Sequence, residues 1–295
     1  MSKIRLSHSA MEGFLLCERK FQLDRLLVGA PAKEEYATTV FGKSFGVGVA
    51  SYLIHQDADK ALYEAWLAYF PVLEEKMRSE MSALFCLIAA FPKLDNLLLD
   101  WEVAIFQGKP AVELSFRLNI NETCYYVGYV DVVLRNRWTG KYAIFEVKTT
   151  GLGLVDLDPL YKNSGQALGY SIVLDKIAGE EEAEYDVIYF AAQLNSKTPF
   201  DVRIHTLPYP KTLRDRLDWF ITLGMDVQRL EQMLEYDIFP KRGGSCLQYM
   251  RPCPHLGTCN LRALDQYKEF EEDTIPYQFI YQLDDIIADH IKRAN

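Results

Sequence analysis

The chain has 295 residues, of which 49% are hydrophobic and 25% charged, a composition typical of a globular protein that can bury a large core. Its net charge of −9 argues against a protein that coats nucleic acid over its whole surface, but leaves room for a nuclease with a local basic groove. We find no apolar run of about 18 residues and no apolar signal-peptide core, so we expect no membrane span and a cytoplasmic location in a bacterium or phage-infected host.

Helices are predicted on both sides of a central group of strands. Ser9 and Glu12 form a capping-box pattern at the start of the first helix, and Pro71 interrupts the third. A mostly helical tail follows a Cys/Pro/Gly-rich loop at 243–260. The predicted helices cover residues 9–27, 41–55, 59–91, 161–178 and 210–236.

Alternating and β-branched segments predict the strands between these helices, and residues 151–159 are expected to form a loop. This order of elements indicates one α/β domain over residues 1–295, with its core at about 100–210 and a helical elaboration. The predicted strands cover residues 101–107, 112–120, 125–134, 141–148, 185–193 and 200–207.

Asp131, Glu146 and Lys148 lie on two of these strands, which read as one β-hairpin. A turn centred between Trp138 and Thr139 places Asp131 opposite Glu146, about 5 Å away at Cβ. Lys148, two residues beyond Glu146, projects from the same face. Two carboxylates this close repel each other unless a cation lies between them. The pattern therefore favours hydrolysis of a phosphodiester with a divalent metal, although the same spacing also occurs on ordinary exposed sheets.

Three of the six cysteines cluster near the C-terminal end, at Cys246, Cys253 and Cys259. In a cytoplasmic protein, three cysteines in a short loop favour metal binding over disulfides. A fourth ligand is then needed, and Cys17 is the expected donor. Zinc with His255 as the fourth ligand is an alternative, and three unliganded cysteines are another.

Five motifs in order carry a family resemblance. They are Ser9–Phe21 with its cysteine before a basic-aromatic pair, Gly128–Asp131, Phe145–Thr149, Gln166–Tyr170 and the three late cysteines. In these motifs the chain resembles RecB-like nucleases of the PD-(D/E)XK superfamily. The similarity is to the iron–sulfur branch, which includes the AddB nuclease domain, CRISPR-associated RecB-like exonucleases and phage exonucleases.

The resemblance implies a restriction-endonuclease-like core, a mixed central sheet flanked by helices, with a Cys-clasped C-terminal segment. It also implies roles for individual residues. Asp131 and Glu146, helped by the Val147 carbonyl, would bind Mg²⁺ or Mn²⁺, and Lys148 would activate the attacking water. The remaining implied roles are DNA binding or shaping of the site by Gln166 and Tyr170, and ligation of a [4Fe-4S] cluster by Cys17, Cys246, Cys253 and Cys259.

One departure from the family pattern concerns the metal site. The family's Gly-x-x-x-His motif matches residues 42–46 here, with Gly46 in the His position. Glu113 is a candidate substitute carboxylate, although an ordinary surface Glu is an equal alternative. The cysteine spacing also differs from the usual one, which keeps zinc open as the bound metal.

Together these features predict a metal-dependent DNA nuclease, an exonuclease on single strands or duplex ends, in recombination, repair or phage DNA processing. DNA is the expected partner, with a helicase or recombination protein supplying it. The alternative is a weak or inactive DNA-binding or assembly subunit that keeps the nuclease fold. RNA as substrate also stays open, because a metal site reads phosphate and not the 2′-hydroxyl.

Overall fold

A computed structural model describes residues 3–28, 37–69, 80–178, 184–194, 201–248, 251–261, 266–270 and 274–294. The chain forms two compact units. Unit 1 comprises Met1–Lys33, Ser115–Gly128 and Leu217–Asn295, and unit 2 comprises Glu34–Leu114 and Tyr129–Arg216. The single domain expected over residues 1–295 stays a prediction.

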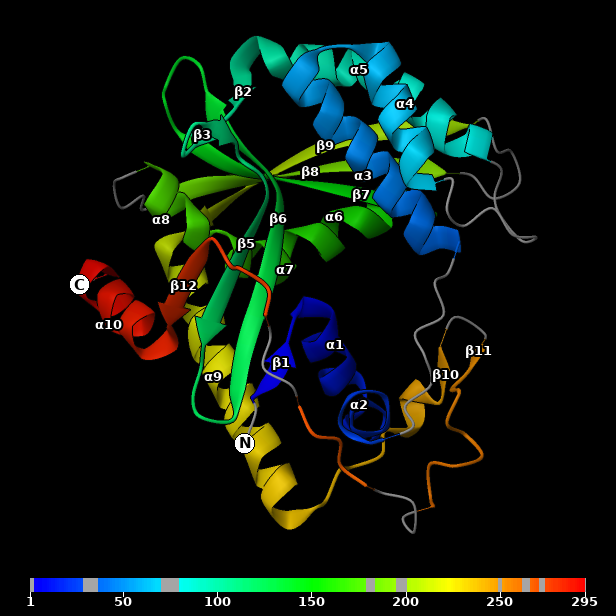
Figure 1. The fold of residues 1–295 in the computed structure, drawn as a ribbon, viewed down its shortest axis with the longest axis vertical. Helices are drawn as coiled ribbons and strands as arrows, with labels where there is room; N and C mark the ends of the chain where they lie inside the picture. Colours follow the sequence, from blue (N-terminus) through cyan, green and yellow to red (C-terminus); the bar gives the residue numbers. More distant parts are fainter. Residues whose placement is uncertain are drawn as a thin grey trace. The chain divides into compact units, whose positions relative to one another are not determined.

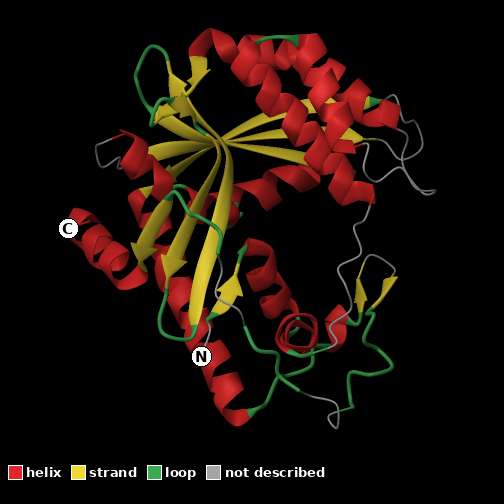
Figure 2. Cartoon of the chain, viewed as in Figure 1, coloured by secondary structure: helices red, strands yellow, loops and turns green. Residues whose placement is uncertain are grey.

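Unit 2 is built on a mixed β-sheet (Figure 2). Strand β7 pairs antiparallel with β6 and parallel with β8, and β8 pairs antiparallel with β9. Strand β2 pairs with the far end of β6, and β3 and β4 form a small separate hairpin. The strands that contribute to unit 2 are β2 (Trp101–Val103), β3 (Ile105–Phe106), β4 (Lys109–Pro110), β5 (Val112–Asn119), β6 (Cys124–Asn136), β7 (Tyr142–Thr150), β8 (Glu184–Leu194) and β9 (Val202–Thr212).

Helices cover both faces of this sheet (Figure 1). Because side chains alternate along each strand, Phe145 and Phe190 point to the same face as the hydrophobic core that α3, α4 and α5 cover. Phe45 of α3 stacks on Phe190 there. The neighbouring residue Glu146 therefore points to the opposite face, which helices α6 and α7 cover. The helices of unit 2 are α3 (Ala37–His55), α4 (Ala58–Tyr69), α5 (Glu80–Asp100), α6 (Leu154–Lys162), α7 (Gln166–Tyr170) and α8 (Ile172–Ala178).

Unit 1 brings the two ends of the chain together around parts of β5 and β6. Strand β1 pairs parallel with β6, and β12 pairs parallel with β5. Helix α9 begins in unit 2 and continues into unit 1. The elements of unit 1 are β1 (Ile4–Leu6), α1 (His8–Leu16), α2 (Glu18–Phe21), a π-helical turn (Gln22–Leu26), α9 (Leu213–Tyr236), a 3₁₀ turn (Gly243–Ser245), β10 (Leu247–Gln248), β11 (Arg251–Pro252), β12 (Phe279–Gln282) and α10 (Leu283–Ala294).

The predicted α/β class, with a mixed central sheet flanked by helices, is confirmed, as is the hairpin of β6 and β7. The predicted capping box is wrong, because Ser7 caps helix α1 by accepting a hydrogen bond from the Ala10 N–H. The predicted loop at 151–159 is also wrong, since α6 begins at Leu154. Pro71 lies outside the described residues.

Two further predictions need correction at the ends of the chain. The first helix is interrupted at Cys17, which has an extended backbone. The tail contains strand β12 before helix α10. In the described part of the chain, no helix combines the length and apolar character needed to cross a membrane.

Candidate active site and cysteine pocket

The register of β6 and β7 is the one that the hairpin predicts. The ladder pairs Val132 with Phe145, and one further step along the two strands brings Asp131 opposite Glu146. Neighbouring residues 132 and 145 both face the hydrophobic core, so Asp131 and Glu146 share the other face. Lys148 follows two residues later on that same face.

Asp131 lies where the two strands stop pairing. Its Oδ2 atom accepts a hydrogen bond of 2.8 Å from the backbone N–H of Val147. The side chain thereby takes the place of a strand backbone as the partner of this N–H. The bond fixes the carboxylate at the end of the ladder and beside Glu146.

Lys148 connects Glu146 to helix α7 through a chain of hydrogen bonds. Its Nζ atom donates to Glu146 Oε1 at 2.7 Å and to Gln166 Oε1 at 2.9 Å. The amide of Gln166 in turn donates to the hydroxyl of Tyr170 at 2.9 Å. The structure thus brings together Glu146, Lys148, Gln166 and Tyr170, which the sequence predicted for the site.

Glu146 is almost fully buried, at 1% exposure, and its two oxygens differ. Oε1 accepts from Lys148, whereas Oε2 is buried with no hydrogen-bond partner among the described residues. A buried carboxylate oxygen without a partner costs free energy unless a cation or a water molecule satisfies it. This atom is therefore a suitable metal ligand.

The electrostatics of the two opposed carboxylates favour a bound cation. Burial raises the pKa of Glu146 to about 8, Asp131 adds to the effect, and Lys148 opposes it. Burial also raises the pKa of Asp131, against the opposing effects of Lys148 and the Val147 hydrogen bond. For Lys148, burial acts to lower the pKa, but the carboxylates of Glu146 and Asp131 outweigh it and the net pKa is raised. The site therefore retains an ammonium group beside two acids that resist ionising together.

Glu113 adds a third carboxyl group to this electrostatic cluster. Although part of Glu113 reaches solvent, the protein around its carboxyl group and the charge of Asp131 raise its pKa to about 7, against the opposing charge of Lys43. Its φ of 51° is a left-handed conformation that costs a non-glycine residue about 1–2 kcal/mol. Strain of this kind is common at functional positions, which supports Glu113 as a member of the site.

Helix α3 packs closely against the end of β7 at a glycine. A Cβ at Gly42 would meet the hydroxyl of Thr149 at 3.2 Å, so glycine allows the helix to lie close to β7. A Cβ at Gly46, one turn later, would meet no described atom within 4 Å. The position that lacks the family histidine is thus open space beside the sheet.

The tyrosines that pack beside Glu146 were not predicted from the sequence. Tyr161 of α6 stacks on Tyr189 of β8 with ring centroids 4.4 Å apart, and Tyr189 lies opposite Glu146 in the ladder. Tyr209 packs against Tyr189 and donates a 2.9 Å hydrogen bond to Asp158. These rings exclude water on one side of Glu146. Tyr185 and Tyr189 lie four residues apart on β8, and Tyr209 lies on β9. The even spacing on β8 places both of its tyrosines on one sheet face and could have indicated them.

The carboxylates of the site do not by themselves surround a metal ion. Among the described residues, no three His, Cys, Asp or Glu side chains converge closely enough to enclose a metal ion. Asp131 and Glu146 can still offer two ligands from one face, and the free oxygen of Glu146 fits such a role.

The sequence matches the PD-(D/E)XK nuclease superfamily over residues 5–260. The chain belongs to this superfamily. Among solved structures, “Putative exonuclease” from Eubacterium rectale is similar, with 14% identity, a TM-score of 0.45, and coverage of 82% of this chain and 85% of that one. SSO0001 is similar with 14% identity, a TM-score of 0.30, and coverage of 70% and 89%. No curated protein matches the sequence.

Members of the PD-(D/E)XK superfamily are nucleases that hydrolyse phosphodiesters, and they generally use divalent metals. The superfamily match includes the acidic pair and Lys148, which occur in the order that its name abbreviates. The predicted membership is therefore confirmed, while the iron–sulfur branch stays a prediction.

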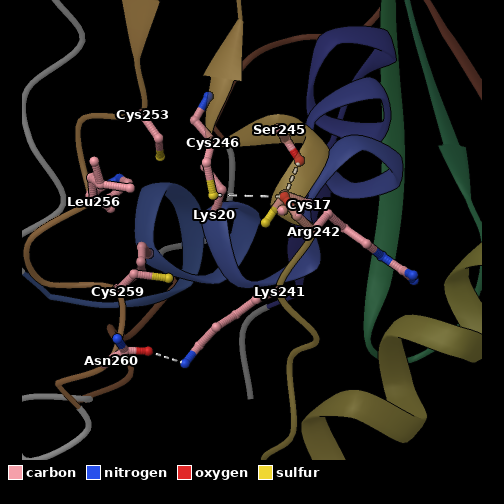
Figure 3. A pocket seen from close by; sticks show the side chains of 13 residues that line it. Cys17, Lys20, Lys241, Arg242, Ser245, Cys246, Cys253, Leu256, Cys259 and Asn260 are labelled. Atoms are coloured by element: carbon pink, nitrogen blue, oxygen red, sulfur yellow. Dashed lines mark hydrogen bonds between the residues drawn. The ribbon is translucent and has the colours of Figure 1, made fainter.

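In this PD-(D/E)XK protein, the four predicted cysteines line one pocket of about 170 Å³ in unit 1. Figure 3 shows Cys17, Cys246, Cys253 and Cys259 arranged around it. The pocket is also lined by the basic residues Lys20, Lys241 and Arg242. His255 lines it too, but its Nε2 lies 2.6 Å from an oxygen of Asp24.

Polar contacts hold the two chain ends together around this pocket. Arg19 of α2, two residues after Cys17, donates to the carbonyls of Cys259 at 3.2 Å and Leu261 at 3.3 Å. The buried Glu18 accepts from Arg242 at 2.7 and 2.8 Å and also from Arg229. These partners were not predicted, because contacts between residues more than 200 positions apart leave no local pattern in the sequence.

Proposed function

We propose that the chain is a divalent-metal-dependent DNA nuclease, an exonuclease that acts on single strands or duplex ends. The observation that carries this proposal is the convergence of Asp131, Glu146 and Lys148 on one sheet face, with a buried oxygen of Glu146 left without a partner. The superfamily match supports hydrolysis of a phosphodiester at this place.

Asp131 and Glu146 would hold Mg²⁺ or Mn²⁺, with the Val147 carbonyl and Glu113 as further ligands. When bound, such an ion lowers the pKa of a water molecule and withdraws charge from phosphate oxygens. The hydrogen bond from Val147 keeps Asp131 oriented, and burial keeps Glu146 away from bulk water.

Lys148 would orient the attacking water and offset the negative charge that builds on the phosphate. Its side chain is 28% exposed, and its ammonium group makes both hydrogen bonds. Gln166 fixes its position from α7, and Tyr170 fixes the amide of Gln166. Gln166 and Tyr170 border the site and can also contact the substrate strand.

We also propose that the four pocket thiols bind a [4Fe-4S] cluster. The donor set is suitable, because four cysteines line one pocket among basic side chains. Zinc is the alternative, because four thiolates, or three thiolates and His255, are also a common zinc ligand set.

A labelled single-stranded DNA incubated with increasing Mn²⁺ or Mg²⁺ tests the proposed activity. Wild-type protein should shorten the strand only when metal is present. Lys148→Ala should lose this activity, while Lys141→Ala, an exposed lysine at the start of β7, should keep it. Equal cleavage by the wild-type protein and Lys148→Ala would defeat the proposal. An RNA strand of the same sequence shows which sugar is preferred.

A second candidate function is DNA binding without cleavage. The open space at Gly46 favours it, because one family metal ligand is missing there. It predicts that the wild-type protein binds the labelled strand and leaves it intact at every metal concentration. A role in recombination, repair or phage DNA processing, with a helicase as partner, stays a prediction under either function.

A further inference from the structure

Further polar side chains lie on the sheet face that carries Lys148. In the ladders, Lys148 lies opposite Ala191 of β8, and Ala191 lies opposite His205 of β9. The next row on the same face pairs Gln193 with Arg203. Ladder partners point to the same face, so all these side chains share the face of the proposed catalytic residues.

This face is exposed at Arg203. Val202 and Ile204, on the opposite face of β9, pack against the hydrophobic core. On the Lys148 face, Tyr161 of α6 covers Tyr189, one row before Lys148. A strand that leaves the site along the sheet is therefore directed toward Arg203.

The chemistry of these side chains suits a nucleic-acid backbone. The side chain of Arg203 is 68% exposed, and its Nε forms a long ion pair with Asp201, 3.8 Å from a carboxylate oxygen. An exposed guanidinium binds phosphate oxygens in a bidentate manner. Beside it, His205 Nε2 and Gln193 Oε1 lie 2.9 Å apart. Burial and the charges of Arg203 and Lys93 lower the pKa of His205. The positive charge at this end of the face therefore lies on Arg203.

We propose that the substrate strand runs from Lys148 over β8 to β9, and that Arg203 binds one of its phosphates. This path rests on the proposed nuclease function, and the distance between its two ends sets a minimum length for the substrate. Two strand spacings and two residues separate Lys148 from Arg203, about 12 Å in total. A single strand at ~3.4 Å per nucleotide needs about four nucleotides to span this distance.

Steady-state cleavage of a strand of about 16 nucleotides and of a trinucleotide tests this path. Arg203→Ala should raise KM for the long strand about tenfold, with kcat within about twofold, because only uniform binding is lost. Cleavage of the trinucleotide, which is too short to reach Arg203, should not change. Arg203→Lys should recover part of the loss. The slope of log affinity against log salt should fall by about 0.7, as expected for one phosphate contact on a single strand.

Lys141→Ala is the matched control, because it removes an exposed charge at the opposite end of β7. An Arg203→Ala variant that behaves like Lys141→Ala on the long strand overturns the path, as does one that lowers kcat equally on both strands.

If the wild-type protein cleaves neither strand, the proposed nuclease function fails, and anisotropy of the labelled long strand decides the path separately. Weaker binding by Arg203→Ala then supports it. Equal binding, or no binding by the wild-type protein, overturns it.

Discussion

The Asp131 carboxylate accepts a 2.8 Å hydrogen bond from the backbone N–H of Val147, at the point where β6 and β7 stop pairing. One side chain therefore serves two purposes. It completes the hydrogen bonding of the strand that carries Glu146 and Lys148, and it adds a carboxylate opposite Glu146 on the same sheet face. An amide at this position can separate the two contributions. It keeps an oxygen that accepts from the Val147 N–H, but it loses the negative charge beside Glu146.

Asp131→Asn should lose most cleavage activity while keeping the fold. Its side-chain oxygen can still accept from Val147, but its charge is gone, and we expect kcat to fall by at least about 100-fold. Asp131→Ala should lose activity equally and also unfold more easily, by about 1 kcal/mol, because the Val147 N–H loses its partner. Urea denaturation and cleavage rates measure the two effects. Glu184→Gln, at the exposed start of β8, is the control, and normal cleavage by Asp131→Asn would contradict the assignment.

Gln166 and Tyr170 should act as positioning residues for Lys148. Gln166→Leu removes a hydrogen-bond partner of the ammonium, and we expect kcat to fall about tenfold while KM changes little. Tyr170→Phe removes the support of the Gln166 amide, so its effect should be smaller. Because both act along one chain of hydrogen bonds, the double variant should be no slower than Gln166→Leu alone. Additive losses would show that the two residues act independently.

Sequence alone was sufficient for the hairpin because its register depends on local information. The turn position fixes which residues oppose each other, and strand alternation fixes their face, so Asp131, Glu146 and Lys148 could be placed together. The hydrogen bond between Gln166 and Lys148 could not be predicted in this way, because it depends on how α7 packs on the sheet.

Other elements depend on contacts that a local pattern does not contain. Strand β12 is four residues long and pairs with β5, which lies more than 150 positions earlier. Helix α6 was missed because Pro159 normally ends a helix. Here the proline removes one hydrogen bond, to the carbonyl of Val155, a residue that is 87% exposed and can bind water instead.

Without divalent metal, the free energy of unfolding should fall as the pH rises from about 5 to about 8. The Glu146 pKa is about 8 in the folded protein and 4.5 for a model group, so folding favours the protonated acid. Such a group contributes fully below its unfolded pKa, and the contribution is lost as the pH rises through its folded pKa. Asp131 and Glu113 act in the same direction.

Urea denaturation in the presence of a chelator, at several pH values, measures this dependence. Glu146→Gln should flatten it, since an amide does not titrate, whereas Glu184→Gln should leave it unchanged. Excess Mg²⁺ should stabilise the wild-type protein most at the alkaline end, where protons no longer compete for the ligands. Stability that rises between pH values of about 5 and 8 in the chelator would contradict the buried, coupled state of these carboxyls.

Glu18 should stabilise the contact between the two chain ends whether or not a metal is bound. It is fully buried and accepts hydrogen bonds from Arg229 and Arg242, so Glu18→Gln removes the charge that both guanidinium groups require. We expect the free energy of unfolding to fall by about 1–3 kcal/mol. Glu122→Gln is the control, because the side chain of Glu122 is fully exposed and lies 3.9 Å from Lys3. An equal and small effect of both changes would show that the buried network contributes little.

The cysteine pocket should give the protein a colour that depends on its thiols. Protein purified without oxygen should absorb broadly near about 400 nm, as expected for thiolate-to-iron charge transfer. Cys253→Ala removes one pocket thiol and should remove the colour, whereas Cys86→Ala, in the core of unit 2, should keep it. Iron and zinc analysis of both variants completes the measurement. Colourless wild-type protein with one zinc per chain would exclude the iron cluster and keep the metal, because four thiolates suit either one. Protein with neither metal would leave the contacts of Glu18 and Arg19 to hold the chain ends together, and the cluster proposal would fail.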